Sequence, residues 1–441
     1  MKNSLKIVLL TTVACALAPM ASAQSSAVEA RLEALEALVQ ELKSELAAEK
    51  AQTDSDLILL EQKATIPAPE VKSVSSGGTN FKISGFIDLD AHVTKLSEGL
   101  PPPANRLDRD FFIPSLIPTS DGSAESSTFT DITARSSRFR LHGDREFNGE
   151  KLTGLIELDF LTTNDGNQRV TSSFSPRLRR AFVDYKGFRV GQEWSTFQNL
   201  SAIPESASFY VLPEGQIFQR QAQIRYTNGP FQIALENGNA TVSDVTGDRI
   251  EADANTIPDV IARYNLKGDF GNISFAGMYR QLSLDTGATD DRGAIDETTS
   301  GFAASVSGRV NVGEGNIRFG VSGGDGLGRY IGLNALRGAI IDPTTGDLEA
   351  ISSIGGHVAL QYPVSEKSRI NVGYSGLFAD NDDFTNTAAA IESLQSGYAA
   401  WMWDIAPKMT VGVEGLYGVN ELENGNDGNL SRFTFSTRYN F

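Results

Sequence analysis

Residues 81–94 read FKISGFIDLDAHVT, and apolar and polar side chains alternate along them. One face carries Phe81, Ile83, Gly85, Ile87, Leu89, Ala91 and Val93, and the other carries Lys82, Ser84, Asp88, Asp90, His92 and Thr94. Successive side chains of a β-strand point to opposite faces of the sheet, so this period of two predicts a long strand with one apolar face. A soluble sandwich can contain one such strand, so the fold depends on how often the pattern recurs.

The alternation recurs in sixteen segments that continue to the C-terminus. They are residues 81–95, 133–145, 151–162, 177–186, 187–196, 219–227, 230–238, 257–266, 271–282, 300–312, 315–323, 352–363, 367–378, 393–405, 407–419 and 430–441. Their connections alternate between short and long. The short connections carry turn residues, as in Asn148-Gly149 and Lys186-Gly187, while the long ones include residues 96–132 and 197–218.

This alternation of short and long connections predicts an all-β fold, a 16-stranded antiparallel transmembrane β-barrel with short turns at one end and long loops at the other. Inside a membrane every backbone N–H and C=O must be paired within the protein, so only helices and closed barrels span it, and strands of about 9 to 11 residues suffice. A barrel of this size encloses an aqueous channel, whereas about eight strands would be filled by side chains.

The composition excludes several other classes. The 441 residues include 38 Lys+Arg against 55 Asp+Glu, a formal net charge of −17, and no basic stripe that would suit nucleic acid. The mean hydropathy is −0.20, and no apolar run is long enough for a membrane-spanning helix. A single cysteine excludes a disulfide framework and a cysteine zinc site. We expect no cofactor, no metal centre and no nucleic-acid partner.

The N-terminus predicts export. Residues 1–23 resemble a signal peptide, with Lys2 and Lys6 before an apolar stretch and Ala21-Ser22-Ala23 as the cleavage site. Cleavage removes the lone Cys15. The alternative is that Cys15 accepts a lipid, but Thr12 is a poor lead residue for that motif.

A helical heptad follows the signal, and we predict a periplasmic coiled-coil helix over residues 24–64, a linker over 65–79 and the barrel over 80–441. The apolar seam consists of Val28, Leu32, Leu35, Val39, Leu42 and Leu46. An apolar seam on a charged helix requires partner helices, so oligomerisation is expected. A single amphipathic helix lying on its own domain is the alternative, and the length and order of the coiled coil stay open.

Aromatic residues predict contacts with lipid and with the assembly machinery. Tyrosines recur near the ends of the apolar faces, where interfacial girdles lie; they are Tyr185, Tyr226, Tyr264, Tyr279, Tyr362, Tyr374, Tyr417 and Tyr439. The last segment alternates aromatic residues and ends on Phe441. That ending resembles the C-terminal signal that outer-membrane proteins present to the barrel-assembly machinery.

Assigning the polar faces to the lumen predicts an interior that is more basic than the whole chain. The arginines expected along the solute pathway are Arg138, Arg140, Arg180, Arg189, Arg225, Arg263, Arg280 and Arg318. All three histidines fall on the same faces. Guanidinium groups bind carboxylates in a bidentate manner and keep their charge, so the excess favours small organic anions. Some of these arginines are expected to pair with lumenal acids and to have a structural role only.

The long connection over residues 197–218 is the candidate constriction loop. It contains Glu205, Phe209, Tyr210 and Glu214. If the loop folds into the lumen, one of its glutamates faces the arginines and creates a transverse field. The sequence does not decide between this arrangement and a loop that stays outside.

The combination of signal peptide, short coiled coil, linker and sixteen-strand barrel resembles the DcaP-like trimeric outer-membrane porins. The stretch Leu178-Arg179-Arg180-Ala181-Phe182-Val183-Asp184-Tyr185, followed by Val190-Gly191-Gln192 and Arg225-Tyr226, is similar to the fourth to sixth strands of that family. The resemblance implies a homotrimer, a periplasmic N-terminal coiled coil, and passive uptake of dicarboxylates and related organic anions.

Other functions stay open. A general non-selective porin fits the same pattern, as does an outer-membrane adhesin or structural tether. A barrel enzyme with an outward Ser and His is disfavoured, because all three histidines have lumenal parity. The acidic stretches Asp290-Asp291 and Asp380-Asn381-Asp382-Asp383 are either solvated surface, a Ca²⁺ site or a bridge to lipopolysaccharide through divalent ions.

Overall fold

The computed structural model describes Gln40 and residues 74–76, 78–103, 106–161, 166–167, 171–244, 246–287, 295–381 and 389–441. The chain divides into two units, residues 1–68 and residues 69–441. The expected signal peptide and all six seam residues of the expected coiled coil lie outside the described residues, so both stay predictions.

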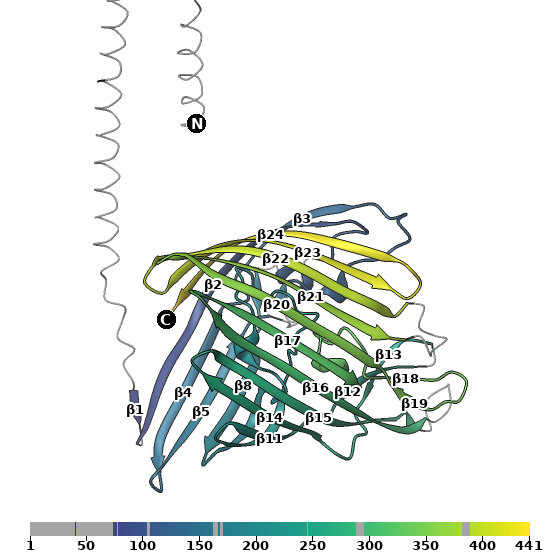
Figure 1. Ribbon diagram of the computed structural model, residues 1–441, viewed down its shortest axis with the longest axis horizontal. Coiled ribbons are helices and arrows are strands. Elements are labelled where there is room, and N and C mark those ends of the chain that lie inside the picture. Colours follow the sequence, from purple (N-terminus) through teal and green to yellow (C-terminus); the bar gives the residue numbers. More distant parts are fainter. Residues whose placement is uncertain are drawn as a thin grey trace, which may run out of the picture. The chain divides into compact units, whose positions relative to one another are not determined.

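Sixteen antiparallel strands close into a barrel within the second unit (Figure 1). They are β2 (Thr79–Leu96), β4 (Arg138–Phe147), β5 (Glu150–Asp159), β8 (Arg177–Tyr185), β9 (Phe188–Trp194), β10 (Arg220–Asn228), β11 (Phe231–Glu236), β14 (Asp259–Gly268), β15 (Gly271–Asp285), β16 (Asp296–Val312), β17 (Gly315–Asp325), β20 (Ser352–Ser365), β21 (Ser368–Asp380), β22 (Ile391–Ala406), β23 (Met409–Leu422) and β24 (Asp427–Asn440). Each strand pairs with the next along the chain, and β24 pairs with β2 to close the ring. The predicted sixteen-stranded barrel is confirmed.

The start of the barrel, around β2, departs from the prediction in two places. The strand expected over residues 133–145 begins only at Arg138, as β4, and β3 (Ser127–Thr133) falls almost wholly within the expected long connection 96–132. Strand β2 pairs with β4 through Asn80–Phe86 and with β3 through Asp90–Leu96. A short strand β1 (Val74–Ser76) pairs with the start of β2, and Gly78 forms the turn between them with a φ of 75°. Strand β1 and this turn lie within residues 65–79, which we assigned to the linker.

The two faces of the barrel strands have opposite chemistry. On β2, Ile87 is 59% exposed and Val93 47% exposed, whereas Asp88 and Asp90 are fully buried. The apolar side chains therefore cover the outside and the charged ones face the lumen, the reverse of a soluble domain. An outer surface of this kind is suited to lipid.

The C-terminus completes the barrel closure. Phe441 and Gly85 exchange two backbone hydrogen bonds of 3.2 and 3.1 Å. Glycine is required at position 85, since a Cβ there would lie 2.8 Å from the Phe441 ring and 2.1 Å from the carbonyl oxygen of Arg138. The residue expected to act as the assembly signal thus packs on the first strand.

The short turns use left-handed residues, as the sequence predicts. Asn148 and Gly149 have φ angles of 50° and 75°, and Lys186 and Gly187 have φ angles of 49° and 83°. Both central residues of a type I′ turn have positive φ, and this turn follows the twist of a hairpin.

The long connections contain their own short elements. These are α3 (Leu107–Asp110), η1 (Pro114–Leu116), η2 (Leu200–Ala202), η4 (Gly328–Tyr330), β6 (Gly166–Asn167), β7 (Ser173–Phe174), β12 (Ala240–Ser243), β13 (Arg249–Ala252), β18 (Ala339–Ile341) and β19 (Leu348–Ala350). Strands β13, β12, β18 and β19 form a separate four-stranded sheet, in which β12 and β18 are parallel. The fully buried Leu212, Tyr330 and Ile331 come from these connections, which pack against the inner face of the barrel.

Candidate functional site

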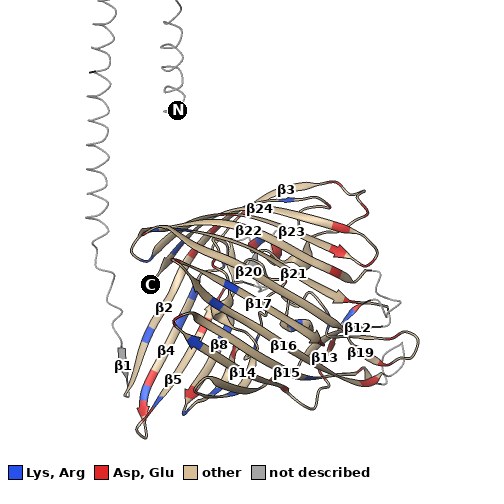
Figure 2. Cartoon of the chain, viewed as in Figure 1, with Lys and Arg blue, Asp and Glu red and all other residues tan. Residues whose placement is uncertain are grey.

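Charged side chains gather on one side of the lumen, along β4, β5, β8, β9 and the start of β10. We call this group the arginine wall; it comprises Arg138, Arg140, Arg177, Arg179, Arg180, Arg189 and Arg220, with Glu157, Asp159, Asp184 and Glu193. Figure 2 shows basic and acidic segments along β4, β5 and β8, whereas β15 and β16 are mostly uncharged. Arginines outnumber carboxylates in this group, so the wall carries a positive surplus.

A register shift brings two unpredicted arginines into the wall. The pairing of β5 with β8 slips between Glu157 and Leu158, so that Glu157 lies opposite Arg180 but Asp159 lies opposite Arg177. The slip is a β-bulge, which adds a residue to one strand and re-aims its side chain. Arg179 is therefore buried beside Arg180, although strict alternation places it outside.

Carboxylates link the arginines of the wall into a ladder. Glu157 lies 2.6 Å from Arg140 and 2.8 Å from Arg179, and Asp159 lies 2.6 Å from Arg179. The next rung joins Glu193 to Arg180 and Arg189, at 2.6 Å in each case.

The members of the ladder differ in their access to water. The Arg179 side chain is only 1% exposed, whereas those of Arg140 and Arg189 are 29% and 27% exposed. The ladder therefore has a buried structural centre and partly hydrated guanidinium groups that a solute can reach.

Arg220 is the member of the wall for which no carboxylate partner is found among the described residues. Its guanidinium carbon lies 4.5 Å from the centre of the Trp194 ring and 5.9 Å from that of Phe218. Its buried Nη1 has no hydrogen-bond partner there. Charge and stacking without a counter-ion leave this guanidinium available to an anion.

The other four predicted arginines have mainly structural contacts. Arg318 donates to the carbonyl oxygen of Ile203 at 2.6 Å, and Arg263 donates to that of Gln198. Arg225 donates to the Thr196 hydroxyl at 2.8 Å. Arg280 is fully buried and lies 3.2 Å from Asp259. Three of the four thus hold the segment that follows β9, and the expectation that some lumenal arginines are structural applies to them.

That segment, residues 195–219 between β9 and β10, is called loop 3 here. Its backbone contacts inward-facing residues of distant strands: the carbonyl oxygen of Ala202 lies 2.9 Å from Nε2 of His357, and the Gly215 amide donates to Ser375 at 2.9 Å. The amide of Ala207 donates to Glu414 at 2.9 Å. These contacts place loop 3 along the inner face of β20 to β23.

The two candidate glutamates of loop 3 point toward that distant face and not toward the arginine wall. Glu205 accepts from Arg369 at 2.6 Å. Burial by itself would raise the pKa of Glu205, but the hydrogen bond and charge of Arg369 lower it below its ordinary value. Glu214 is fully buried and accepts from the Ser396 hydroxyl. Burial raises the pKa of Glu214 to about 7.

The two candidate aromatics of loop 3 lie nearer to the arginine wall. Tyr210 is 3% exposed, and its ring lies 4.1 Å from that of Phe218. Phe209 lies 5.2 Å from Phe111 and 5.8 Å from the guanidinium carbon of Arg179.

The histidines do not form an outward catalytic site. His92 and His357 are buried, and Nδ1 of His92 lies 2.9 Å from the Thr434 hydroxyl. His142 Nε2 lies 3.2 Å from the Ser84 hydroxyl on the inner face. No group of three or more metal-ligating side chains occurs in the part of the chain that the structure describes. The two acidic stretches considered for Ca²⁺ lie largely outside that part.

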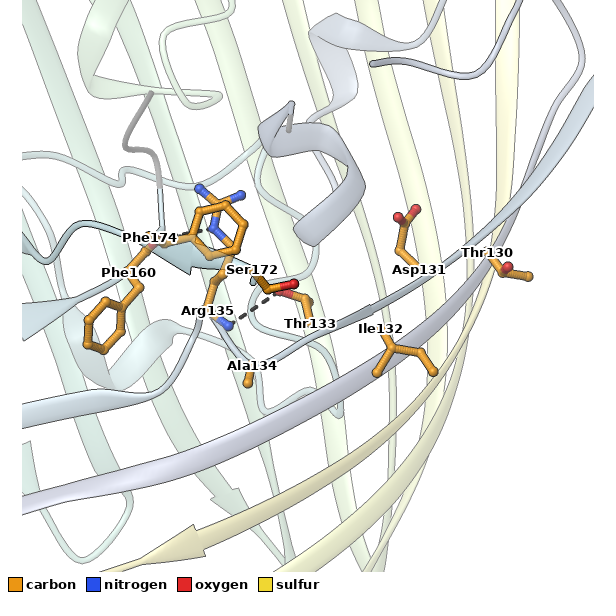
Figure 3. A pocket seen from close by; sticks show the side chains of 9 residues that line it. All are labelled: Thr130, Asp131, Ile132, Thr133, Ala134, Arg135, Phe160, Ser172 and Phe174. Carbon is orange, nitrogen blue, oxygen red and sulfur yellow. Dashed lines mark hydrogen bonds between the residues drawn. The ribbon is translucent and has the colours of Figure 1, made fainter. Parts of the chain in front are cut away.

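A cavity of about 550 Å³ lies where β3 meets the end of β5 (Figure 3). Figure 3 shows Asp131 on one side of β3 and Ile132 on the other, with Arg135 over the Phe174 ring. The guanidinium carbon of Arg135 lies 4.2 Å from the centre of that ring. The cavity therefore adjoins the break between β3 and β4.

Among the described residues, no helix is long and apolar enough to cross a membrane.

A closed barrel of sixteen strands with an apolar outside and a charged lumen defines a β-barrel membrane channel. A family model described as "Porin subfamily" matches residues 77–424, and the chain belongs to this porin family. The resemblance to DcaP-like porins is thereby confirmed, and an outer-membrane channel is the class of protein that family and fold support.

Solved structures with the same fold include the outer-membrane channel DcaP of Acinetobacter baumannii, with 22% identity and a TM-score of 0.67 over 83% of this chain and 99% of that one. An anion-selective porin from Comamonas acidovorans has 12% identity and a TM-score of 0.50 over 82% and 100% of the two chains. OmpT of Vibrio cholerae has 12% identity and a TM-score of 0.50 over 84% and 100%. A comparison with curated proteins finds no significant match.

Proposed function

We propose that this porin lets small hydrophilic solutes diffuse passively across the outer membrane, with a preference for organic anions such as dicarboxylates. The observation that carries the proposal is the positive surplus of the arginine wall, and above all the unpaired guanidinium of Arg220. Spaced guanidinium groups of moderate exposure bind an anion weakly enough to release it, which permeation requires.

The placement of loop 3 supports the same route. Glu205 is neutralised by Arg369, and Glu214 is buried at Ser396, so neither carboxylate opposes the wall arginines directly. An anion that passes between loop 3 and β4 to β9 meets guanidinium groups on one side. The aromatic rings of loop 3 lie on the other.

The rest of the proposed assembly follows from the sequence. We infer a homotrimer joined through the N-terminal helix in the periplasm, lipid and lipopolysaccharide around the apolar outer face, and delivery by the barrel-assembly machinery through Phe441. A general non-selective porin is the second candidate, since carboxylates already neutralise most of the ladder. An adhesin, a tether or a barrel enzyme has no supporting observation in the lumen.

Reversal potentials in planar bilayers test the anion preference. In a KCl gradient, the potential is expected to have the sign of an anion-selective channel, and exchange of chloride for succinate on one side is expected to leave a large succinate current. A cation-selective potential would contradict the proposal, and absence of any conductance would contradict the channel itself.

The variant Arg220→Gln tests whether Arg220 is responsible for the anion preference. Because no carboxylate loses its partner, the fold is expected to persist while anion selectivity falls. The matched control is Arg145→Gln, which removes the same charge from an exposed site on β4. Equal selectivity in both variants would show that Arg220 is not part of the pathway.

A further inference from the structure

A compact group of apolar side chains lies in the lumen beside the arginine wall. We call it the apolar bridge; it consists of Leu107, Phe111, Ile113, Leu161, Phe209 and Leu333. Phe111 is 5% exposed, Ile113 8% and Leu161 1%, and the other three are partly buried against them.

The bridge extends across the lumen. Its members come from the connection after β2, from the end of β5, from loop 3 and from the connection between β17 and β20. In the barrel order β17 stands opposite β5, and Leu333 lies in the connection that follows β17, so its packing against the cluster that contains Leu161 brings this connection across the lumen. A cluster that includes both narrows the open cross-section of the channel.

Polar anchors hold the two aromatic rings of the bridge. Asp110, next to Phe111, is bound by Arg135, and its carbonyl oxygen lies 3.0 Å from Nε2 of His92. Ser208, next to Phe209, donates to Glu414 at 2.6 Å. The rings therefore have fixed places and are not the tips of free loops.

The bridge adjoins the buried centre of the arginine wall, which Glu157 links to the partly hydrated Arg140. The guanidinium carbon of Arg179 lies 5.8 Å from the Phe209 ring and 5.7 Å from the Trp194 ring. Phe209 is thus the member of the bridge that lies beside the arginine wall.

We propose that the apolar bridge is a hydrophobic constriction, with Phe111 and Phe209 as the residues that determine specificity. A hydrated inorganic ion has to keep its water shell beside apolar walls, and such constrictions hinder it by dewetting. An organic anion with an apolar face instead buries that face against the rings while its carboxylate stays on the arginines. The inference rests on the proposed function, to which it adds a preference for anions with an apolar face over chloride and acetate.

Single-channel recording in KCl tests the constriction with Phe209→Ala, Phe111→Ala and the double variant. The conductance of each is expected to rise, at least about twofold for the double variant, because the dewetted section widens. Phe302→Ala is the matched control: Phe302 is 60% exposed on the outer face, and its loss is expected to leave conductance unchanged. Phe209→Leu keeps an apolar side chain and is expected to stay close to the unmodified protein. Heat-modifiable mobility in detergent confirms that each barrel is folded.

Biionic potentials with cyclohexanecarboxylate against acetate test the specificity. The unmodified protein is expected to favour cyclohexanecarboxylate, and Phe209→Ala to lose that preference. Unchanged KCl conductance in folded Phe111→Ala, Phe209→Ala and double variants would overturn the constriction. Cation selectivity of the unmodified protein would instead overturn the proposed function. This selectivity is measured from the sign of the reversal potential in KCl, whereas the constriction is measured from the size of the current.

Discussion

The arginine wall and the opposite inner face, on β20 to β23, meet the lumen in different ways. The first is formed by long charged side chains that link to one another and remain partly hydrated. The second carries inward glycines, and we call it the docking wall, defined by Gly355, Gly373, Gly412 and Gly418. One side of the lumen therefore presents charged groups to solutes, and the other side packs against the loops of the barrel.

The glycines of the docking wall leave room for loop side chains. A Cβ on Gly373 would lie 2.9 Å from Leu212, and one on Gly418 would lie 2.5 Å from the Phe112 ring. Contacts below about 3 Å are closer than packed carbon atoms tolerate. Inward glycine thus marks where a loop packs, whereas water remains at the partly exposed members of the arginine wall, such as Arg140 and Arg189.

The largest effect is expected from breaking the centre of the arginine wall with Arg179→Gln. The substitution leaves Glu157 and Asp159, which are 2% and 0% exposed, without their buried partner. Removing one member of a buried ion pair costs about 3–5 kcal/mol. Thermal unfolding in detergent is expected to shift to a much lower temperature.

The matched variant for this prediction is Arg140→Gln, which removes an arginine that is 29% exposed. A partly hydrated pair contributes about 1 kcal/mol or less, so the unfolding temperature should change little. An equal fall in unfolding temperature in the two variants would show that the burial of an arginine does not determine its contribution to the stability of the wall.

A smaller effect is expected from breaking the contact of loop 3 with the docking wall through Gly215→Ala. The new Cβ would lie 2.1 Å from the carbonyl oxygen of Gly356, a clash with backbone that only a shift of loop 3 can relieve. Overpacking of this kind costs about 1–3 kcal/mol. We expect a folded barrel with higher conductance, as measured in planar bilayers.

The control for Gly215→Ala is Gly277→Ala on β15, where an added Cβ meets no atom within 4 Å. It is expected to match the unmodified protein in stability and conductance. A Gly215→Ala channel with ordinary conductance would indicate that loop 3 does not narrow the pathway.

The last prediction concerns the pH dependence of the two glutamates of loop 3, Glu205 and Glu214, which contact the docking wall. Because burial raises the pKa of Glu214 from 4.5 to about 7, the folded state keeps a proton that the unfolded state releases. Stability from this group is complete below pH 4.5 and is lost as pH rises to about 7, by at most about 1.4 kcal/mol per pH unit. Glu205 has a lowered pKa, so its contribution is lost only as pH falls.

Unfolding temperatures measured between pH 4.5 and 7 in the unmodified protein and in Glu214→Gln check this dependence. The variant cannot ionise at this site, so its curve is expected to be flatter. Parallel curves would exclude Glu214 as the source of the pH dependence.

The strand pattern could be read from the sequence because lipid and water impose a strict alternation on each strand. The residues that depart from this alternation could not be predicted from the sequence. Arg177 and Arg179 enter the wall through a bulge, and a bulge shifts the parity without a sequence signal of its own. The break between β3 and β4 is likewise without a sequence signal, since no side chain near Ala134 indicates that pairing with β2 stops there.

The contacts of the lumenal residues were harder to predict than their position. Parity along the strands predicts that the eight arginines face the lumen, yet Arg225, Arg263 and Arg318 bind loop 3, and the path of that loop depends on distant strands. The inward glycines were a usable signal, because a strand interior favours glycine only where another segment approaches closely.

The contact between Gly85 and Phe441 has a consequence for the order of folding. The closing strands also join Asp88 to Arg438, which are separated by 350 positions. Such a non-local contact has the largest loop-closure entropy in the barrel and forms late. The edge of β2 that pairs with β24 must therefore stay unpaired, and protected from other strands, until β24 is available.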